Sequence, residues 1–128
     1  MDNSKKTKRK ILVTQALPYA NAPLHLGHIL EAVQTDIWTR FHNFSGNDCL
    51  FFCADDTHGT PVMLKANEMG IKPEKLISDV YIDHKSTYEL YGINFANFYS
   101  THSDENRKYS EYIYCLLYTS PSPRDLST

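Results

Sequence analysis

The chain has 128 residues, of which 41% are hydrophobic and 22% are charged, and its formal net charge at pH 7 is −2. This length suits about one domain, and the apolar fraction is enough for a packed core. No apolar run reaches the length of a membrane span and no secretory signal is visible, so we expect a cytoplasmic protein with no membrane partner.

Positive charge is concentrated at the start of the chain, in the run Lys5-Lys6-Thr7-Lys8-Arg9-Lys10. We interpret residues 1–9 as a basic, solvated lead-in to the first element. The remaining residues are more acidic than the chain as a whole, so they are predicted to offer no broad basic face for nucleic acid.

The pattern of apolar residues predicts a strand, a helix and a second strand. Residues 10–15 contain a short β-branched run that is typical of a buried strand. A helix is predicted to follow His28, because apolar residues recur at helical spacing up to the turn-forming residues 45–48. Residues 49–54 are apolar almost without interruption, which a parallel strand covered on both faces requires.

Two further helices and a third strand are predicted in the second half of the chain. One helix runs from Thr60-Pro61 to Gly70, where proline suits the first turn and glycine the end. A longer helix starts at Pro73 and ends at Gly92, and its predicted buried face contains Ile77, Val80, Tyr81, His84, Tyr88 and Tyr91. A short strand is expected within residues 93–101.

A last helix is predicted from an N-cap at Ser103, with two acidic residues in its first turn. Its apolar residues recur at helical spacing, so we expect an inner face made of Tyr109, Tyr112, Ile113 and Leu116.

Strand, helix and strand in this order indicate a right-handed βαβ unit. The predicted fold class is therefore α/β, with a Rossmann-like parallel sheet and flanking helices. Ligands of such sheets bind at the carboxyl ends of the strands. The loops that follow Val13 and Ala54 are expected to share that edge.

The three cysteines, Cys49, Cys53 and Cys115, have neither the spacing of a zinc site nor that of a disulfide framework. Cys49 and Cys53 are four residues apart in strand-like sequence, so both are expected on one side of the strand. We predict buried thiols there and no metal site.

The loop before the first helix carries His25-Leu26-Gly27-His28. Free backbone N–H groups and the dipole at a helix start favour an anion, and Gly27 would let a ligand approach the backbone. His25 and His28 lie on one face if the helix has begun, which indicates a phosphate site. Two ordinary surface histidines are one alternative. A metal pair is another, although zinc normally takes three or four ligands.

The same four residues resemble the HIGH signature of class I aminoacyl-tRNA synthetases, and the stretch from Ile11 to His28 more narrowly resembles methionyl-tRNA synthetases. Two further blocks resemble the same family in the same order, Cys53–Pro61 and Tyr99–Arg107. The resemblance spans about residues 10–114. An unrelated HxGH nucleotidyltransferase would share only the first block.

The resemblance implies that the complete enzyme joins methionine to tRNA(Met) in two steps. The methionine carboxylate attacks the α-phosphorus of ATP, which binds with Mg²⁺, and displaces pyrophosphate to give methionyl-adenylate. A ribose hydroxyl of the tRNA then takes the methionyl group and releases AMP. The family match assigns His25 and His28 as the catalytic pair that hydrogen-bonds the ATP phosphates, and Gly27 as a neighbour of the adenosine. Catalysis of this kind is mainly positioning and electrostatic stabilisation.

The resemblance also assigns Leu17, Tyr19 and Asp56 to methionine binding. Asp56 would bind the ammonium group, and the other two would contact the thioether, which packs well against aromatic rings. For Leu17 and Tyr19 the alternative is core packing. Because Asp55 and Asp56 precede a predicted helix, we expect one of these two carboxylates to act as its N-cap instead.

The expected organisation is a basic lead-in (1–9), the N-terminal half of a class I catalytic domain (10–114) and a tail (115–128). The tail resembles an in-frame translation of a sequencing adaptor and is expected to be non-native, with a natural tail as the alternative. The KMSKS motif is absent from the sequence. Contacts to tRNA, and the zinc that some family members hold in an insertion, are expected in regions outside it.

We therefore expect a truncated methionine-tRNA ligase that is inactive as this chain. Two alternatives remain at this point. One is a stand-alone HxGH adenylyltransferase, which would need its own basic phosphate-binding segment. The other is a non-enzymatic module that keeps the fold to hold a nucleotide or a partner.

Overall fold

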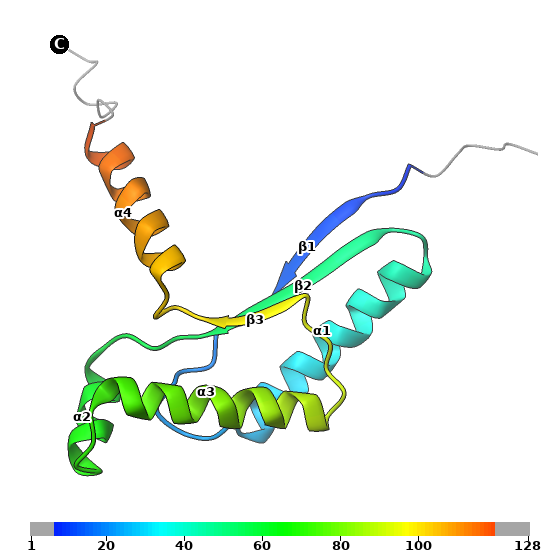
Figure 1. The fold of residues 1–128 in the computed structure, drawn as a ribbon. Coiled ribbons are helices and arrows are strands. Elements are labelled where there is room, and N and C mark those ends of the chain that lie inside the picture. The colour runs from blue at the N-terminus through cyan, green and yellow to red at the C-terminus, as the bar shows by residue number, and fades with distance from the viewer. Residues whose placement is uncertain (1–6, 120–128) are drawn as a thin grey trace, which may run out of the picture.

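A three-stranded parallel sheet forms the centre of the computed structural model, which describes residues 7–119 (Figure 1). In chain order its elements are β1 (Lys10–Thr14), α1 (Leu26–Phe44), β2 (Asp48–Asp55), α2 (Thr60–Glu68), α3 (Pro73–Leu90), β3 (Asn97–Ser100) and α4 (Asp104–Thr119). Within these residues no helix is both long and apolar enough to cross a bilayer.

The strands follow the order β1-β2-β3, and both neighbouring pairs are parallel. Ile11 lies opposite Cys49, and Cys53 lies opposite Phe98. The predicted α/β class with a Rossmann-like parallel sheet is confirmed. Cys49 and Cys53 are buried free thiols on the same side of β2, also as predicted.

Both long helices α1 and α3 cover the same face of the sheet. The buried cluster between them and the sheet contains Ile29, Ala32, Phe51, Cys53, Tyr88, Ile93 and Phe98. Two successive crossovers of the same hand, both stepping in one direction along the sheet, bring their helices to one face. The expectation that both faces are covered is therefore wrong for residues 7–119: Leu12 and Leu50 on the opposite face are 70% and 46% exposed.

The helix ends differ from the predictions in two places. Helix α1 begins at Leu26 with His25 as its N-cap, so it starts before His28 rather than after it. Helix α2 has Gly59 as its N-cap and no side-chain cap, so neither Asp55 nor Asp56 plays the capping role expected of one of them. Glycine with a φ of 120° turns the chain into the helix there instead.

On α3 the predicted face is buried at Ile77, Val80, His84 and Tyr88. Tyr91, the last member of that face, is 55% exposed because it is the C-cap residue, beyond the last helical turn that faces the sheet. The apolar periodicity therefore predicted the buried face of α3 correctly within the helix, and it was wrong for the C-cap residue.

Helix α4 projects away from the sheet, and none of its residues is buried (Figure 1). Its N-cap is correct, since Ser103 Oγ accepts a hydrogen bond from the Asn106 N–H at 3.2 Å. The predicted inner face is exposed, because no other described element packs against it; it comprises Tyr109, Tyr112, Ile113 and Leu116. The helix continues through residues 115–119, and the rest of the expected tail, 120–128, lies outside the described residues.

Replacing Phe51 by Ala should destabilise the chain strongly, because the side chain is 1% exposed at the centre of the main cluster. Truncating a buried Phe typically costs about 3–5 kcal/mol of unfolding free energy. Phe44→Ala is the matched control, since Phe44 is 91% exposed. Urea unfolding followed by circular dichroism measures both, and equal effects would contradict the assigned core.

Candidate functional site

Two loops leave the carboxyl edge of the sheet, one after β1 and one after β2, and their backbones pair. The Ala20 N–H donates to the Asp56 carbonyl at 2.8 Å, and the Asp56 N–H donates to the Pro18 carbonyl at 2.9 Å. This isolated parallel bridge joins Tyr19 to Asp56. The structure thus brings together the predicted methionine-binding positions. Leu17 lies beside the bridge and is 44% exposed, and Asp56 is half-buried.

The two histidines cap the start of α1 reciprocally. His25 Nδ1 accepts from the Gly27 N–H at 3.1 Å and from the His28 N–H at 3.4 Å. The His25 N–H in turn donates to His28 Nδ1 at 3.4 Å. The two rings stack, with centroids 3.7 Å apart and planes at 16°. Both predicted phosphate-binding side chains therefore lie together at one helix N-terminus.

This arrangement selects the tautomer of each neutral ring. Because each Nδ1 is an acceptor, each Nε2 must carry the ring proton. Partial burial, followed by the positive charges of His25 and His84, lowers the pKa of His28 below its ordinary value, which favours its neutral form. The site therefore combines two imidazole N–H donors with the positive end of the α1 dipole, a set suited to an anion. The Gly27 and His28 N–H groups do not add to this set, because they already donate to His25 Nδ1.

The His25 ring requires a glycine at position 27, in addition to the predicted access of a ligand to the backbone. A Cβ at this position would lie 2.9 Å from His25 Cε1. Any side chain would therefore push the His25 ring out of its capping position.

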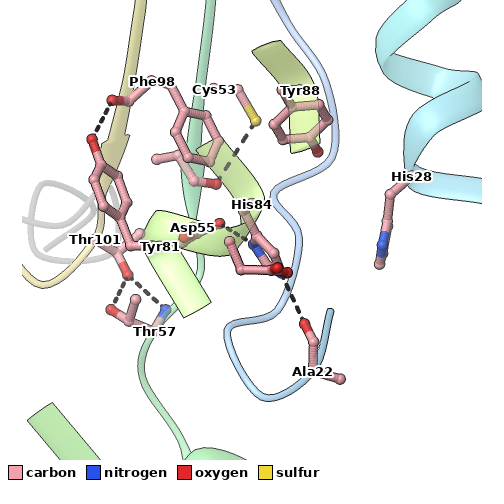
Figure 2. A network of polar contacts seen from close by, with 12 residues as sticks. Ala22, His28, Cys53, Asp55, Thr57, Tyr81, His84, Tyr88, Phe98 and Thr101 are labelled. Atoms are coloured by element: carbon pink, nitrogen blue, oxygen red, sulfur yellow. Dashed lines mark hydrogen bonds and ion pairs between the residues drawn. The ribbon is translucent and has the colours of Figure 1, made fainter. Parts of the chain in front are cut away.

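A buried histidine–aspartate pair lies between the end of β2 and the loop that contains Ala22 (Figure 2). His84 Nδ1 is 2.7 Å from Asp55 Oδ1, and His84 Nε2 is 2.8 Å from the Ala22 carbonyl oxygen. Both side chains are essentially inaccessible to solvent. Burial alone would lower the pKa of His84, but the hydrogen bonds to Asp55 and Ala22 and the negative charge of Asp55 raise it overall.

Tyr19 is held against the loop that precedes α2. Its hydroxyl donates to the His58 carbonyl. A Cβ on Gly59 would lie 2.4 Å from that hydroxyl oxygen, and Gly59 has a φ of 120°. The hydroxyl group of Tyr19 therefore occupies the space that a side chain at position 59 would need.

Four residues that shape this site were not assigned to it from the sequence: Glu31, Asp55, Gly59 and His84. The Glu31 carboxylate accepts from the Ala16 N–H at 2.8 Å and so holds the start of the first loop. Asp55 and His84 carry a signal that could have found them. Asp55 is in phase with buried Cys49, Phe51 and Cys53, and His84 is in phase with the buried face of α3. A charged group on a buried face needs a partner.

Among residues 7–119, no three histidine, cysteine or acidic side chains gather as a metal site would require. The hollow between the end of β3 and the start of α4 lies next to the loops, with His58 on its wall.

Residues 11–121 match the family described as tRNA synthetases class I (M). Two solved structures of Mycobacterium tuberculosis methionyl-tRNA synthetase with methionyl-adenylate are similar to this chain. One is 28% identical with a TM-score of 0.75, covering 79% of this chain and 20% of that one. The other is 29% identical with a TM-score of 0.76, covering 84% and 21%.

The same fold occurs in a leucyl-tRNA synthetase of Agrobacterium radiobacter, solved as a ternary complex with tRNA and LeuAMS. It is 24% identical, with a TM-score of 0.81 over 89% of this chain and 15% of that one. This chain therefore spans between 15% and 21% of the length of these three structures.

Gly59→Ala should displace Tyr19 and destabilise the chain by more than backbone strain alone explains. Gly46→Ala is the matched control, because Gly46 also has a positive φ but a Cβ there would meet nothing within 4 Å. Strain at a left-handed residue typically costs about 1–3 kcal/mol, and the clash adds to it only at position 59. Adding Tyr19→Phe removes the clashing oxygen.

Thermal unfolding of the two single variants and the double variant measures the difference. Partial rescue of Gly59→Ala by Tyr19→Phe is the expected result. Equal loss of stability in both glycine variants would show that Tyr19 does not lie over Gly59.

Proposed function

Since the chain belongs to the class I tRNA synthetases (M), we propose that it is the N-terminal part of the catalytic domain of a methionine-tRNA ligase, which acts in the cytoplasm. In the complete enzyme this domain would activate methionine with ATP and Mg²⁺ and pass it to tRNA(Met), which would bind mainly through other domains. The observation that carries the proposal is the Tyr19–Asp56 bridge beside the capped start of α1.

We propose that His25 and His28 bind the ATP phosphates, with Gly27 against the adenosine. Negative charge grows on the phosphate oxygens as the methionine carboxylate attacks. Donors that are already oriented stabilise this charge without reorganising. The reciprocal cap supports the role, because it holds both rings before any ligand arrives.

Methionine would bind on the other side of the loop. Asp55 is fully buried and already paired with His84, so we assign the ammonium group of the substrate to half-buried Asp56. Tyr19 and Leu17 would contact the thioether. Tyr19 is well suited to this role, because its hydroxyl is bonded to the backbone and its ring position is therefore defined.

The extent of the family match supports methionine-tRNA ligase activity over a stand-alone HxGH adenylyltransferase. A stand-alone HxGH adenylyltransferase would share the histidine loop alone, whereas the match covers residues 11–121. A non-enzymatic nucleotide-binding module would bind ATP without a preference for an amino acid.

The first test is therefore binding selectivity. Calorimetry should show that the chain binds methionyl sulfamoyl adenosine, a stable analogue of methionyl-adenylate, more tightly than leucyl sulfamoyl adenosine or ATP. Asp56→Asn should weaken methionyl-analogue binding roughly tenfold or more, because an ion pair to the ammonium is lost. Asp104→Asn, an exposed acidic residue on α4, is the control. A preference for the leucyl compound, or none, would contradict the assignment.

The second test uses the complete enzyme. His28→Ala should lower the rate of methionine-dependent pyrophosphate exchange by roughly 100-fold, with little change in the KM for methionine, because its N–H matters most in the transition state. His42→Ala, at the other end of the same helix, should have no such effect. A pure rise in the methionine KM for His28→Ala would assign this residue to substrate binding instead.

A further inference from the structure

The loop that carries the proposed ligand contacts has little backbone structure of its own. Pro18 and Pro23 lack N–H groups and therefore cannot donate backbone hydrogen bonds. Outside the Tyr19–Asp56 bridge, side chains from other elements hold it. Glu31 of α1 binds its start at Ala16, and His84 of α3 binds the Ala22 carbonyl, three residues before His25.

We propose that His84 is a positioning residue: as a buried imidazolium it joins the end of β2 to the loop before α1 and holds the proposed phosphate-binding and methionine-binding positions together. The proposal rests on the proposed function only in assigning ligands to those positions. The link itself is a property of the fold.

The hydrogen-bond partners favour a positively charged ring. The Ala22 carbonyl can only accept, so His84 Nε2 must carry a proton. The facing oxygen of Asp55, when ionised, can also only accept, so Nδ1 must carry a second one. A doubly protonated ring satisfies both partners at once, and the carboxylate balances its charge.

Each end of this link adjoins one part of the proposed site. Asp55 is the residue before Asp56, and Ala22 precedes His25 by three residues. The ring between them belongs to α3, whose neighbouring side chains Val80 and Tyr88 are buried. A helix that supplies no proposed ligand contact thereby sets the separation of the two loops.

Charged groups around His84 affect its protonation, and the charge of His84 in turn affects that of His28. Asp55 from β2 and Asp83 from α3 favour the imidazolium. Burial, the charge of His25 and the charge of His84 together lower the pKa of His28 from α1 and so favour its neutral form. Cys53, on the neighbouring position of the buried face of β2, is neutral at physiological pH, since burial raises its pKa to about 12. The charge of His84 thus adds to the effect of burial in favouring the neutral form of His28, which donates from Nε2.

Two substitutions separate the two hydrogen bonds of the ring. An asparagine amide nitrogen falls near the place of Nδ1, so His84→Asn keeps the bond to Asp55 and loses the bond to Ala22. A glutamine amide nitrogen falls near the place of Nε2, so His84→Gln keeps the bond to Ala22. Tyr81→Phe is the control, because it removes one hydrogen bond from the same helix to Phe98 in β3.

Hydrogen exchange of the loop amides is the first readout. In His84→Asn, which releases the Ala22 end of the link, the Ala20 and Gly27 amides should exchange at least tenfold faster, while Tyr81→Phe should leave them near wild type. Binding of methionyl sulfamoyl adenosine should fall at least tenfold in both His84→Asn and His84→Gln, because each breaks one end of the link, and less than about threefold in Tyr81→Phe. Exchange and binding near wild type in His84→Asn would overturn the proposal.

The charge of the ring is tested in the wild-type chain. Imidazole ¹⁵N chemical shifts at neutral pH should show both nitrogens of His84 protonated, and a single-tautomer neutral ring would overturn the proposal. This measurement also decides the matter if His84→Asn does not fold. If the wild-type chain fails to bind the adenylate analogue, the proposed function fails, while the exchange and ¹⁵N results still decide the role of His84.

The pH dependence has a defined sign. The folded pKa of His84 lies above the ordinary value of 6.5, so its contribution to stability is full below that value and is lost as pH rises through the folded pKa. The stability advantage of wild type over His84→Gln should therefore be largest near about pH 6 and shrink toward about pH 9. The corresponding difference for Tyr81→Phe should stay flat, and a flat profile for His84→Gln would contradict an imidazolium.

Discussion

Parallel pairing of β1 with β2 is the constraint on which the rest of this structure depends. It sends both strands toward one edge, so the loops after Thr14 and Asp55 must leave the sheet side by side. The backbone bridge between Tyr19 and Asp56 continues the same pairing beyond the strands. Residues almost forty positions apart in the sequence are neighbours for this reason, and α1 begins beside them.

The site separates positive charge from hydrogen-bond donation. The imidazolium of His84 is buried behind the loop and paired with Asp55, whereas His28 at the surface is favoured as a neutral donor. Neutral donors can approach a phosphate without first giving up a counterion. The His84 ring of this pair also donates to the Ala22 carbonyl, and this bond helps to define the shape of the loop before α1.

Periodicity and turn residues predicted the strands, the long helices and the shared edge, because one buried face repeats along each element. These predictions were wrong where an element has no buried face, or where a contact joins two elements. Helix α4 has an amphipathic sequence but nothing described to pack on. The capping role expected of Asp55 or Asp56 was wrong because Asp55 pairs with His84, a contact between elements that local pattern rules do not include. The family resemblance supplied site residues that spacing alone left open between phosphate, metal and surface histidines.

The central claim is that the paired loops bind an aminoacyl-adenylate, and mapping the bound ligand by NMR tests it most directly. On titration with methionyl sulfamoyl adenosine, backbone amide shifts should be confined to residues 17–28 and 56–59. Shifts centred instead on the hollow at the start of α4, around Tyr99 and His102, would contradict the account, as would the absence of any shift in the paired loops.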